Sequence, residues 1–352
     1  MIESILIFLL IVLFLIVPHE FGHFLAAKWR GVRVDEFGVG FPIPGKSWKL
    51  FGRKIGETIY TINLLPLGGF VRIFGEEEDI ENPRSFSNQP FWARTFIVAA
   101  GALANIFIGF VIFTFLAWYG EPRFGVKIAE VTLDSPASMA GLKAGDIVVG
   151  IEGQRIPELQ LEAVLEYINA KRGVEASFLV ERDGHELMLH GTPRENPPKG
   201  EGAFGVRIGA EEIGIVRIPW YRAPIEGLRH VIETISLVLL GLWMLVRDLV
   251  SSGSVPGQIV GPIGITVVAR ETLAVSIRLF LSLVALLSIN LAVFNILPIP
   301  ALDGGRIFFF IIEKFRGKPI ASTFSHVIHS IFFLLLITLL IVITYREISS
   351  FI

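Results

Sequence analysis

Two histidines and a glutamate interrupt an otherwise apolar stretch near the amino terminus, in the run His19-Glu20-Phe21-Gly22-His23. Charged and imidazole side chains are costly in hydrocarbon, so they persist there mainly where they have a function. On a helix, this spacing places both imidazoles on one face, where they can bind one Zn²⁺. Glu20 then lies where it can take a proton from a water that the metal activates. The pattern predicts a metal site buried in a membrane.

Composition supports a membrane protein. The mean hydropathy is +0.63, and only 18% of residues are charged, whereas soluble domains carry roughly 25%. A net charge of −2 argues against nucleic acid as a partner. The chain has no cysteine, which excludes disulfides and thiolate ligands. Histidine, aspartate and glutamate are therefore the residues left to hold a metal.

Three segments are readily apolar enough to span a bilayer, which needs about 20 residues: Ile5–Ala27, Phe96–Tyr119 and Val327–Tyr345. A fourth, Leu279–Leu302, qualifies if the polar and proline residues Asn290, Asn295, Pro298 and Pro300 are tolerated within it. The first has Glu3 and no basic residue in front of it, and no small-residue cleavage site follows. We therefore interpret it as a retained span and not as a signal peptide.

Basic residues predict the orientation of these spans. None precedes the first span, whereas residues 28–94 contain ten lysines and arginines, and four more lie between the last two spans. Both loops are therefore expected to be cytoplasmic, and both termini external. The apolar stretch 232–246 is ambiguous, because it is short and bounded by charges. If it spanned, the region of Asp303 would lie on the side opposite the two histidines. On the premise that Asp303 is a metal ligand, we interpret the stretch as an interfacial or bundle-docked amphipathic helix.

Asp303 is the best candidate for a third metal ligand, at the end of a broken apolar helix. Asn290 and Asn295 place amides in this helix, and such amides must bond to protein, water or substrate. Pro298 and Pro300 interrupt the backbone hydrogen bonds, which is tolerated at membrane depth only where the freed groups line a cavity or pack in protein. A broken helix that ends in a carboxylate can serve as a ligand platform.

Other interpretations of these residues remain open. Gly304 and Gly305 allow a turn or a close approach of the backbone, and an Asp-Gly-Gly run by itself is usually a turn at a membrane boundary. His326 and His329 form a competing pair at the mouth of the last span, where interfacial packing or solvation is the simpler expectation.

Taken together, these motifs resemble the site-2 protease family of intramembrane zinc metalloproteases, and within it the bacterial regulator-of-sigma-E protease group. The shared marks are HEFGH, the NxLPxPxLDGG stretch that ends at Gly305, and the glycine-rich run Pro66–Arg72. The resemblance implies zinc bound by His19, His23 and Asp303, with Glu20 as the catalytic base. Many relatives have histidine where this chain has Arg306, so the role of that position is open.

The loop after the first span alternates apolar and polar residues around 49–62 and 68–73, which predicts short strands or hairpins and not a helix. The resemblance implies a β-hairpin that re-enters the membrane near the metal and offers an edge strand to substrate, with Gly68 and Gly69 in contact with it. A plain cytoplasmic hairpin is the alternative. The acidic run 76–79 is expected to be a solvated turn.

Residues 121–194 have the composition of a soluble domain, and the stretch 135–147 resembles a bacterial PDZ domain. Residues 161–170 would form its groove helix, and Phe124-Gly125-Val126 the loop that receives a terminal carboxylate. A steric filter that binds no peptide is the alternative. The near-repeat of residues 124–128 at residues 204–208 is too short to predict a second domain.

The expected fold is a polytopic α-helical membrane protein of four spans with an inserted α+β PDZ domain. Its parts are residues 1–120, with the first two spans and the re-entrant loop; 121–194, the PDZ domain; 195–275, an external linker and amphipathic helix; and 276–352, the last two spans. The expected location is a bacterial inner membrane, with the PDZ domain and termini external and the metal near the cytoplasmic side.

The expected function is zinc-dependent endoproteolysis of single-span membrane proteins, such as anti-sigma factors or signal-peptide remnants, within the bilayer. Substrate contacts are assigned to Asn290, Asn295, Pro298, Pro300, Gly68 and Gly69, and no oligomer is required. A PDZ-bearing scaffold with a vestigial metal site would not need Glu20. A transporter would need a continuous polar pathway, and the other spans carry almost no ionisable groups.

Overall fold

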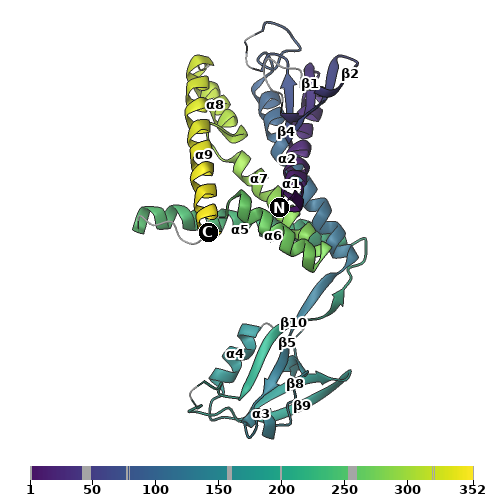
Figure 1. The fold of residues 1–352 in the computed structure, drawn as a ribbon, viewed down its shortest axis with the longest axis vertical. Coiled ribbons are helices and arrows are strands. Elements are labelled where there is room, and N and C mark those ends of the chain that lie inside the picture. The colour runs from purple at the N-terminus through teal and green to yellow at the C-terminus, as the bar shows by residue number, and fades with distance from the viewer. Residues whose placement is uncertain are drawn as a thin grey trace. The chain divides into compact units, whose positions relative to one another are not determined.

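The computed structural model describes residues 2–351 apart from 42–48, 77, 79, 157–160, 199, 253–259, 319 and 321. The chain forms two compact units. The first comprises Met1–Ala117 and Pro219–Ile352, and the second is Trp118–Ile218. The first unit is mainly helical with one small sheet, and the second is built around a larger sheet (Figure 1).

Long apolar helices make up most of the first unit. They are α1 (Ile2–Trp29), α2 (Phe91–Tyr119), α5 (Ala223–Ser252), α7 (Ile277–Ile296) and α9 (Ser322–Phe351), joined by the shorter α6 (Pro262–Val275) and α8 (Asp303–Arg316). The five long helices are each long and apolar enough to cross a membrane. Four of them coincide with the predicted spans. Helix α7 ends at Ile296, earlier than expected, because the backbone turns extended at Leu297, just before Pro298.

Helix α5 differs from the expectation of a short apolar segment at 232–246. It has 30 residues and lies crosswise to α1, α2 and α9 in Figure 1. Val231 packs in a buried cluster with Ile289 and Val293 of α7, whereas many of its other large apolar side chains are exposed. Helix α5 is therefore long enough to span a membrane. However, it lies across the end of the helix bundle and packs on α7.

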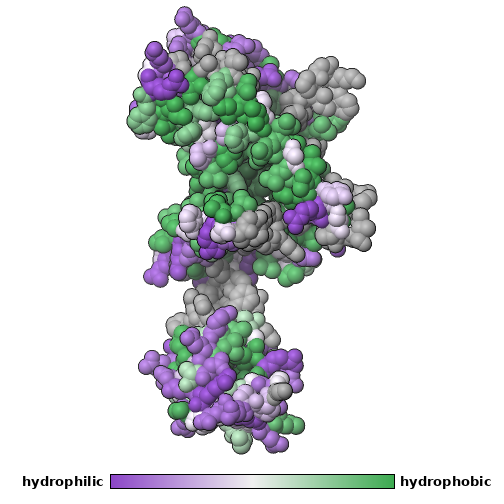
Figure 2. All heavy atoms as spheres, turned by 90° about the vertical axis from the view of Figure 1, so that its left-hand side faces the viewer, coloured by the Kyte–Doolittle hydropathy of each residue, from purple (hydrophilic) through white to green (hydrophobic). Residues whose placement is uncertain are grey.

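The two ends of the first unit differ in character. Both chain termini lie at the end where α5 and α6 are found, and the small sheet and α8 lie toward the other end (Figure 1). Figure 2 shows hydrophobic residues over most of one face of this unit, with hydrophilic residues gathered toward its upper end. The surface therefore has the distribution that a bilayer-embedded bundle requires.

The loop between α1 and α2 folds into a four-stranded sheet. Its strands are β1 (Val34–Phe41), β2 (Lys49–Ile55), β3 (Thr58–Asn63) and β4 (Leu65–Ile73), in the order β2-β3-β1-β4. The strands expected around 49–62 are β2 and β3, which form an antiparallel hairpin with Ile55 opposite Thr58, and the strand expected at 68–73 lies in β4. Strand β1 was not predicted; it pairs in parallel with β3 and antiparallel with β4. Among the described residues β4 is an edge strand, and it lies along α1.

The second unit is a sheet with two helices. The strands are β5 (Glu121–Val131), β6 (Ile147–Ile151), β7 (Gln154–Arg155), β8 (Ala176–Arg182), β9 (His185–Gly191) and β10 (Val206–Val216); the helices are α3 (Pro136–Met139) and α4 (Leu161–Ala170). The strand order is β10-β5-β6-β8-β9, with β7 beside β6. The core includes Val126, Phe178, Val180 and Phe204.

This unit extends past the expected boundary at residue 194, because the last strand completes the sheet. The near-repeated segments 124–128 and 204–208 meet in it, with Ile208 opposite Ile128 in the antiparallel pair of β5 and β10. The expectation that residues 124–126 form a carboxylate-receiving loop is wrong in its geometry. Val126 is buried within β5 and pairs with Ala210 on one side and Val148 on the other. The expected helix at 161–170 is α4.

Candidate metal centre and active site

Three side chains from two helices converge at one point. His19 and His23 lie one turn apart on α1 and are 7% and 8% exposed, and Asp303 is the first residue of α8. One oxygen of Asp303, Oδ2, lies 3.1 Å from Nε2 of His19 and 3.3 Å from Nε2 of His23. The two Nε2 atoms are 3.2 Å apart. Helices α1 and α8 thus bring together the three residues that were predicted as ligands.

The spacing of these atoms fits a metal ion. Ligands about 2.05 Å from a tetrahedral zinc are about 3.3 Å from one another, close to the 3.1, 3.2 and 3.3 Å found here. Two imidazoles and one carboxylate are also a donor set that zinc accepts, with the fourth position left for water or substrate. His19, His23 and Asp303 are the only group of this kind found among the described residues.

Helix α2 holds the histidines in place. Nδ1 of His23 donates a hydrogen bond to the carbonyl oxygen of Ile97 at 2.8 Å, which leaves Nε2 free to act as a ligand. A Cβ atom on Gly101 would lie 2.4 Å from Nε2 of His23 and 2.7 Å from Cε1 of His19. One on Gly22 would lie 2.3 Å from the carbonyl oxygen of Ala100. Only glycine at 22 and 101 permits α1 and α2 to pack this closely.

Gly22 and Gly101 were not among the predicted site residues. The signal that could have identified them is the run of small residues Ala99-Ala100-Gly101-Ala102 in the second span. Small residues at membrane helix interfaces mark close packing of backbones, and here the partner is the helix that carries the histidines.

The turn before Asp303 depends on two more glycines. A Cβ atom on Gly304 would lie 2.2 Å from the carbonyl oxygens of Ile296 and Leu297, and one on Gly305 would lie 2.3 Å from that of Ile299. The first turn of α8 therefore packs directly on the end of α7 and on the connecting turn. This contact fixes the start of α8 and, with it, the position of the carboxylate.

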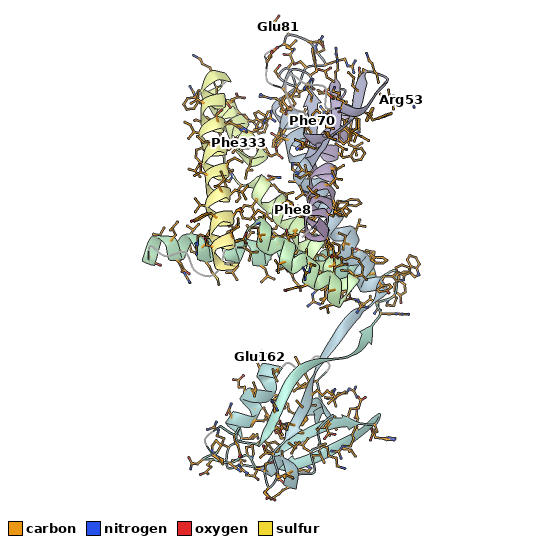
Figure 3. The ribbon with its side chains drawn as sticks, in the orientation of Figure 1. Phe8, Arg53, Phe70, Glu81, Glu162 and Phe333 are labelled. Carbon is orange, nitrogen blue, oxygen red and sulfur yellow. The ribbon has the colours of Figure 1, made fainter. Side chains whose placement is uncertain are left out.

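Strand β4 runs past the glutamate of the histidine motif. A Cβ on Gly69 would lie 3.4 Å from Cγ of Glu20, and one on Gly68, which has φ +89°, would lie 3.2 Å from Cδ1 of Ile16. The ring of Phe70, labelled in Figure 3, lies over Gly38 of β1. The two adjacent glycines thus allow the edge strand to approach α1 at the level of Glu20.

A cavity of about 1020 Å³ contains Glu20 and the three convergent side chains. Its lining also includes charged residues from the loop after β4 and from α8, among them Glu76, Arg306, Glu313 and Lys314. Arg306 forms an ion pair with Glu76, and Arg94 of α2 lies 3.2 Å from Glu313. Glu76, expected in a solvated turn, is therefore bound to the helix that begins at Asp303.

The predicted substrate-binding residues divide into two groups. The amide nitrogen of Asn295 lies 3.5 Å from Nε2 of His19, and Pro300 lines the cavity. Asn290 is half-buried on α7 and Pro298 is exposed, and neither is among the described residues that line the cavity. Of the competing histidines, His329 lines the cavity, and the side chain of His326 lies outside the described residues.

Comparison with known proteins gives a consistent picture. Residues 7–339 match the model of a family described as peptidase family M50. The zinc metalloprotease RasP of Geobacillus kaustophilus is 31% identical, over 99% of this chain and 98% of its own length. A protein of Agrobacterium fabrum named as a zinc metalloprotease is 30% identical, over 98% of this chain and 95% of its own. Another, from Clostridium perfringens, is 31% identical, over 95% of each chain.

Proposed function

Because the chain belongs to peptidase family M50, the site-2 protease family of zinc metalloproteases, we propose that His19, His23 and Asp303 bind the zinc and that Glu20 is the catalytic base. The observation that carries this assignment is the triangle of three ligand atoms 3.1–3.3 Å apart, next to Glu20 in one cavity. The reaction is hydrolysis of a peptide bond within the membrane.

When bound, zinc polarises the scissile carbonyl and lowers the pKa of water toward about 7. Glu20 accepts the proton of the attacking water and then delivers it to the leaving nitrogen. His23 is held by the carbonyl of Ile97, so its ring keeps one orientation through the cycle. The amide of Asn295, 3.5 Å from His19, is positioned to bond to the substrate backbone next to the scissile bond.

The substrate is a single-span membrane protein whose helix unwinds at the cleavage point. A helix hides its amide bonds, whereas an added β-strand exposes them and is held by main-chain hydrogen bonds. Strand β4 offers such an edge, and its Gly69 packs next to Glu20. Pairing with β4 would therefore present an extended peptide to the base and the metal ligands.

We assign the protein to a bacterial inner membrane with four spans, α1, α2, α7 and α9. Both termini lie at one end of the bundle (Figure 1), as an even number of crossings requires. Helix α5 lies across that end and packs on α7, in support of an interfacial position. By the distribution of basic residues, the end with the sheet is cytoplasmic and the end with the termini external.

The second unit serves as an external PDZ domain. The support is its α+β fold, in which α4 lies beside the edge strand β10, because PDZ domains bind peptides between a helix and a sheet edge. The domain could bind a peptide, or it could reject substrates with bulky external domains. Substrates that differ only in the length of their external part distinguish these two roles, because only a size filter makes cleavage depend on that length.

The decisive experiment compares Glu20→Gln with the wild type in detergent. We expect Glu20→Gln to keep about one zinc per chain and to lose cleavage of a model single-span substrate. Glu3→Gln, at the start of the same helix, is the matched control and should leave both unchanged. His23→Ala should lose both metal and cleavage. Cleavage near the wild-type rate in Glu20→Gln would refute the role of the base.

The same experiment separates the rival functions. A scaffold with a structural metal would bind zinc in every variant except His23→Ala and would cleave nothing in any of them. The presence of an acid in the cavity beside the ligands favours the protease, because a structural site needs no base.

A further inference from the structure

Helix α9 borders the cavity but is little buried. Ser325 and His329 belong to the cavity lining, and no side chain of α9 that the structure describes is buried. Figure 3 labels Phe333 on this helix, which is 56% exposed. Since apolar packing does not fix α9 within the unit, polar contacts become important for its position.

One polar contact lies near the carboxyl end of α9. The carboxylate of Glu347 accepts hydrogen bonds from the backbone N–H groups of Gly261 at 2.6 Å, Gly264 at 3.0 Å and Ile263 at 3.2 Å. These groups form the start of α6, where unpaired N–H groups and the helix dipole favour an anion. Hydrogen bonds between N–H groups and a carboxylate are stronger than those between neutral groups.

The start of α6 is shaped for this carboxylate. A Cβ atom on Gly261 would lie 2.7 Å from Oε2 of Glu347, and one on Gly264 would lie 2.7 Å from Oε1. Only glycine at these two positions leaves room for the acid. A carboxylate within an apolar helix is costly unless it is bonded, so this contact holds α9 against α6.

A second polar contact lies near the amino-terminal end of the same helix. Nδ1 of His329 donates a hydrogen bond of 2.8 Å to the carbonyl oxygen of Pro300. Pro300 belongs to the turn that precedes Asp303. Gly305 packs on that turn so closely that an added Cβ atom would lie 2.5 Å from Cα of Pro300. A shift of this turn would therefore move the start of α8, where the carboxylate ligand lies.

We propose that α9 is a strut between the start of α6 and the ligand-bearing turn, held at Glu347 and at His329, and that both residues are positioning residues for the metal site. They are 18 positions apart in one helix, a separation of about 27 Å at 1.5 Å per residue. A continuous helix is stiff over this length, so release at either end lets the turn drift. This inference rests on the assignment of Asp303 as a zinc ligand.

The first test is zinc affinity of the full-length protein, measured by competition with a chelator. Residues that orient metal ligands typically contribute 10- to 100-fold to affinity, so Glu347→Ala and His329→Ala should each weaken zinc binding by about 10-fold or more. His329→Asn should retain most of the affinity, because its amide N–H can replace Nδ1 as a donor. Ser349→Ala is the matched control, since that hydroxyl bonds only to the carbonyl of Tyr345 among described contacts.

The double variant Glu347→Ala/His329→Ala tests whether the two contacts act through one helix. If the two contacts act through one helix, the zinc affinity of the double variant should equal that of the single variant that binds zinc more weakly. Effects that multiply would overturn the coupling, and wild-type affinity in Glu347→Ala would overturn the proposal. Loss of zinc in Asp303→Ala with wild-type affinity in both single variants would refute the strut while leaving the proposed function intact.

A second readout depends on neither zinc nor activity. Because the chain has no cysteine, Ser330→Cys on α9 and Leu103→Cys on α2 can carry a pair of spin labels. We expect one narrow distance distribution in the wild-type background and a broadened one with Glu347→Ala. An unchanged distribution with Glu347→Ala would show that this contact does not hold α9 and would refute the strut.

Discussion

Gly101→Ala should weaken zinc binding although no ligand is changed. The added Cβ would lie 2.4 Å from Nε2 of His23 and 2.7 Å from Cε1 of His19, and ordinary contacts begin at 3.4 Å. The nearer ring must therefore move by about 1.0 Å to reach an ordinary contact, or α2 must withdraw by as much. Zinc–ligand distances tolerate about 0.2 Å, so the shift exceeds the tolerance about fivefold.

We expect a loss of about 100-fold in zinc affinity, or about 2.8 kcal/mol, measured by chelator competition on the purified protein. Alanine is also a better helix former than glycine by about 1 kcal/mol, so circular dichroism should show α2 intact. Gly109→Ala is the matched control, because its Cβ would meet the side chain of Ile289 at 2.7 Å, away from the ligands. Wild-type zinc affinity in Gly101→Ala would refute the reasoning.

Two other substitutions test the ligand turn and the second unit. Gly304→Ala would place a Cβ 2.2 Å from the carbonyl oxygen of Ile296, so zinc affinity should fall about 10- to 100-fold; a normal zinc content in dilute chelator would contradict this. Arg182→Met leaves Asp146, which is 1% exposed, without its two-point partner. The unit should lose about 3 kcal/mol of stability at pH 7, seen as a lower melting temperature. Burial raises the pKa of Asp146, but the hydrogen bonds from Arg182 and from the backbone N–H of Lys143 together outweigh it, and the pKa is lowered. This stabilisation is present above the unfolded pKa of about 3.9, so the difference between variant and wild type should shrink as the pH falls below about 4.

The three proposed metal ligands could be selected from the sequence because their signals are local. His19 and His23 are four residues apart on one helix, so the helical period alone places them together. The proline-broken helix before Asp303 showed that a backbone break at membrane depth must line a cavity or pack in protein. The link between the histidines of α1 and Asp303 of α8 could be inferred only from their chemistry, because two imidazoles need a third ligand such as a carboxylate. In the structure the three side chains lie together.

The contacts that hold the site depend on partners far away in the chain. Gly101 in α2 matters because His23 lies beside it, and no periodicity in either segment reveals that pair. Likewise, β1 was not predicted. It pairs in parallel with β3, and a parallel pair is not joined by a tight turn that could be recognised in the sequence. The second unit ended later than expected for the same reason, since β10 pairs with β5 across most of the unit.

The cavity beside Glu20 also bears on how hydrolysis can occur among apolar helices. Each cleaved bond consumes one water molecule, and hydrocarbon holds almost none. The cavity that contains Glu20 and the proposed ligands is also lined by Glu76, Arg306 and Lys314, whose charges favour hydration of the cavity. If cleavage occurs here as proposed, the water that is consumed and the scissile bond share one cavity, and the rate of cleavage need not be limited by the permeation of water through lipid.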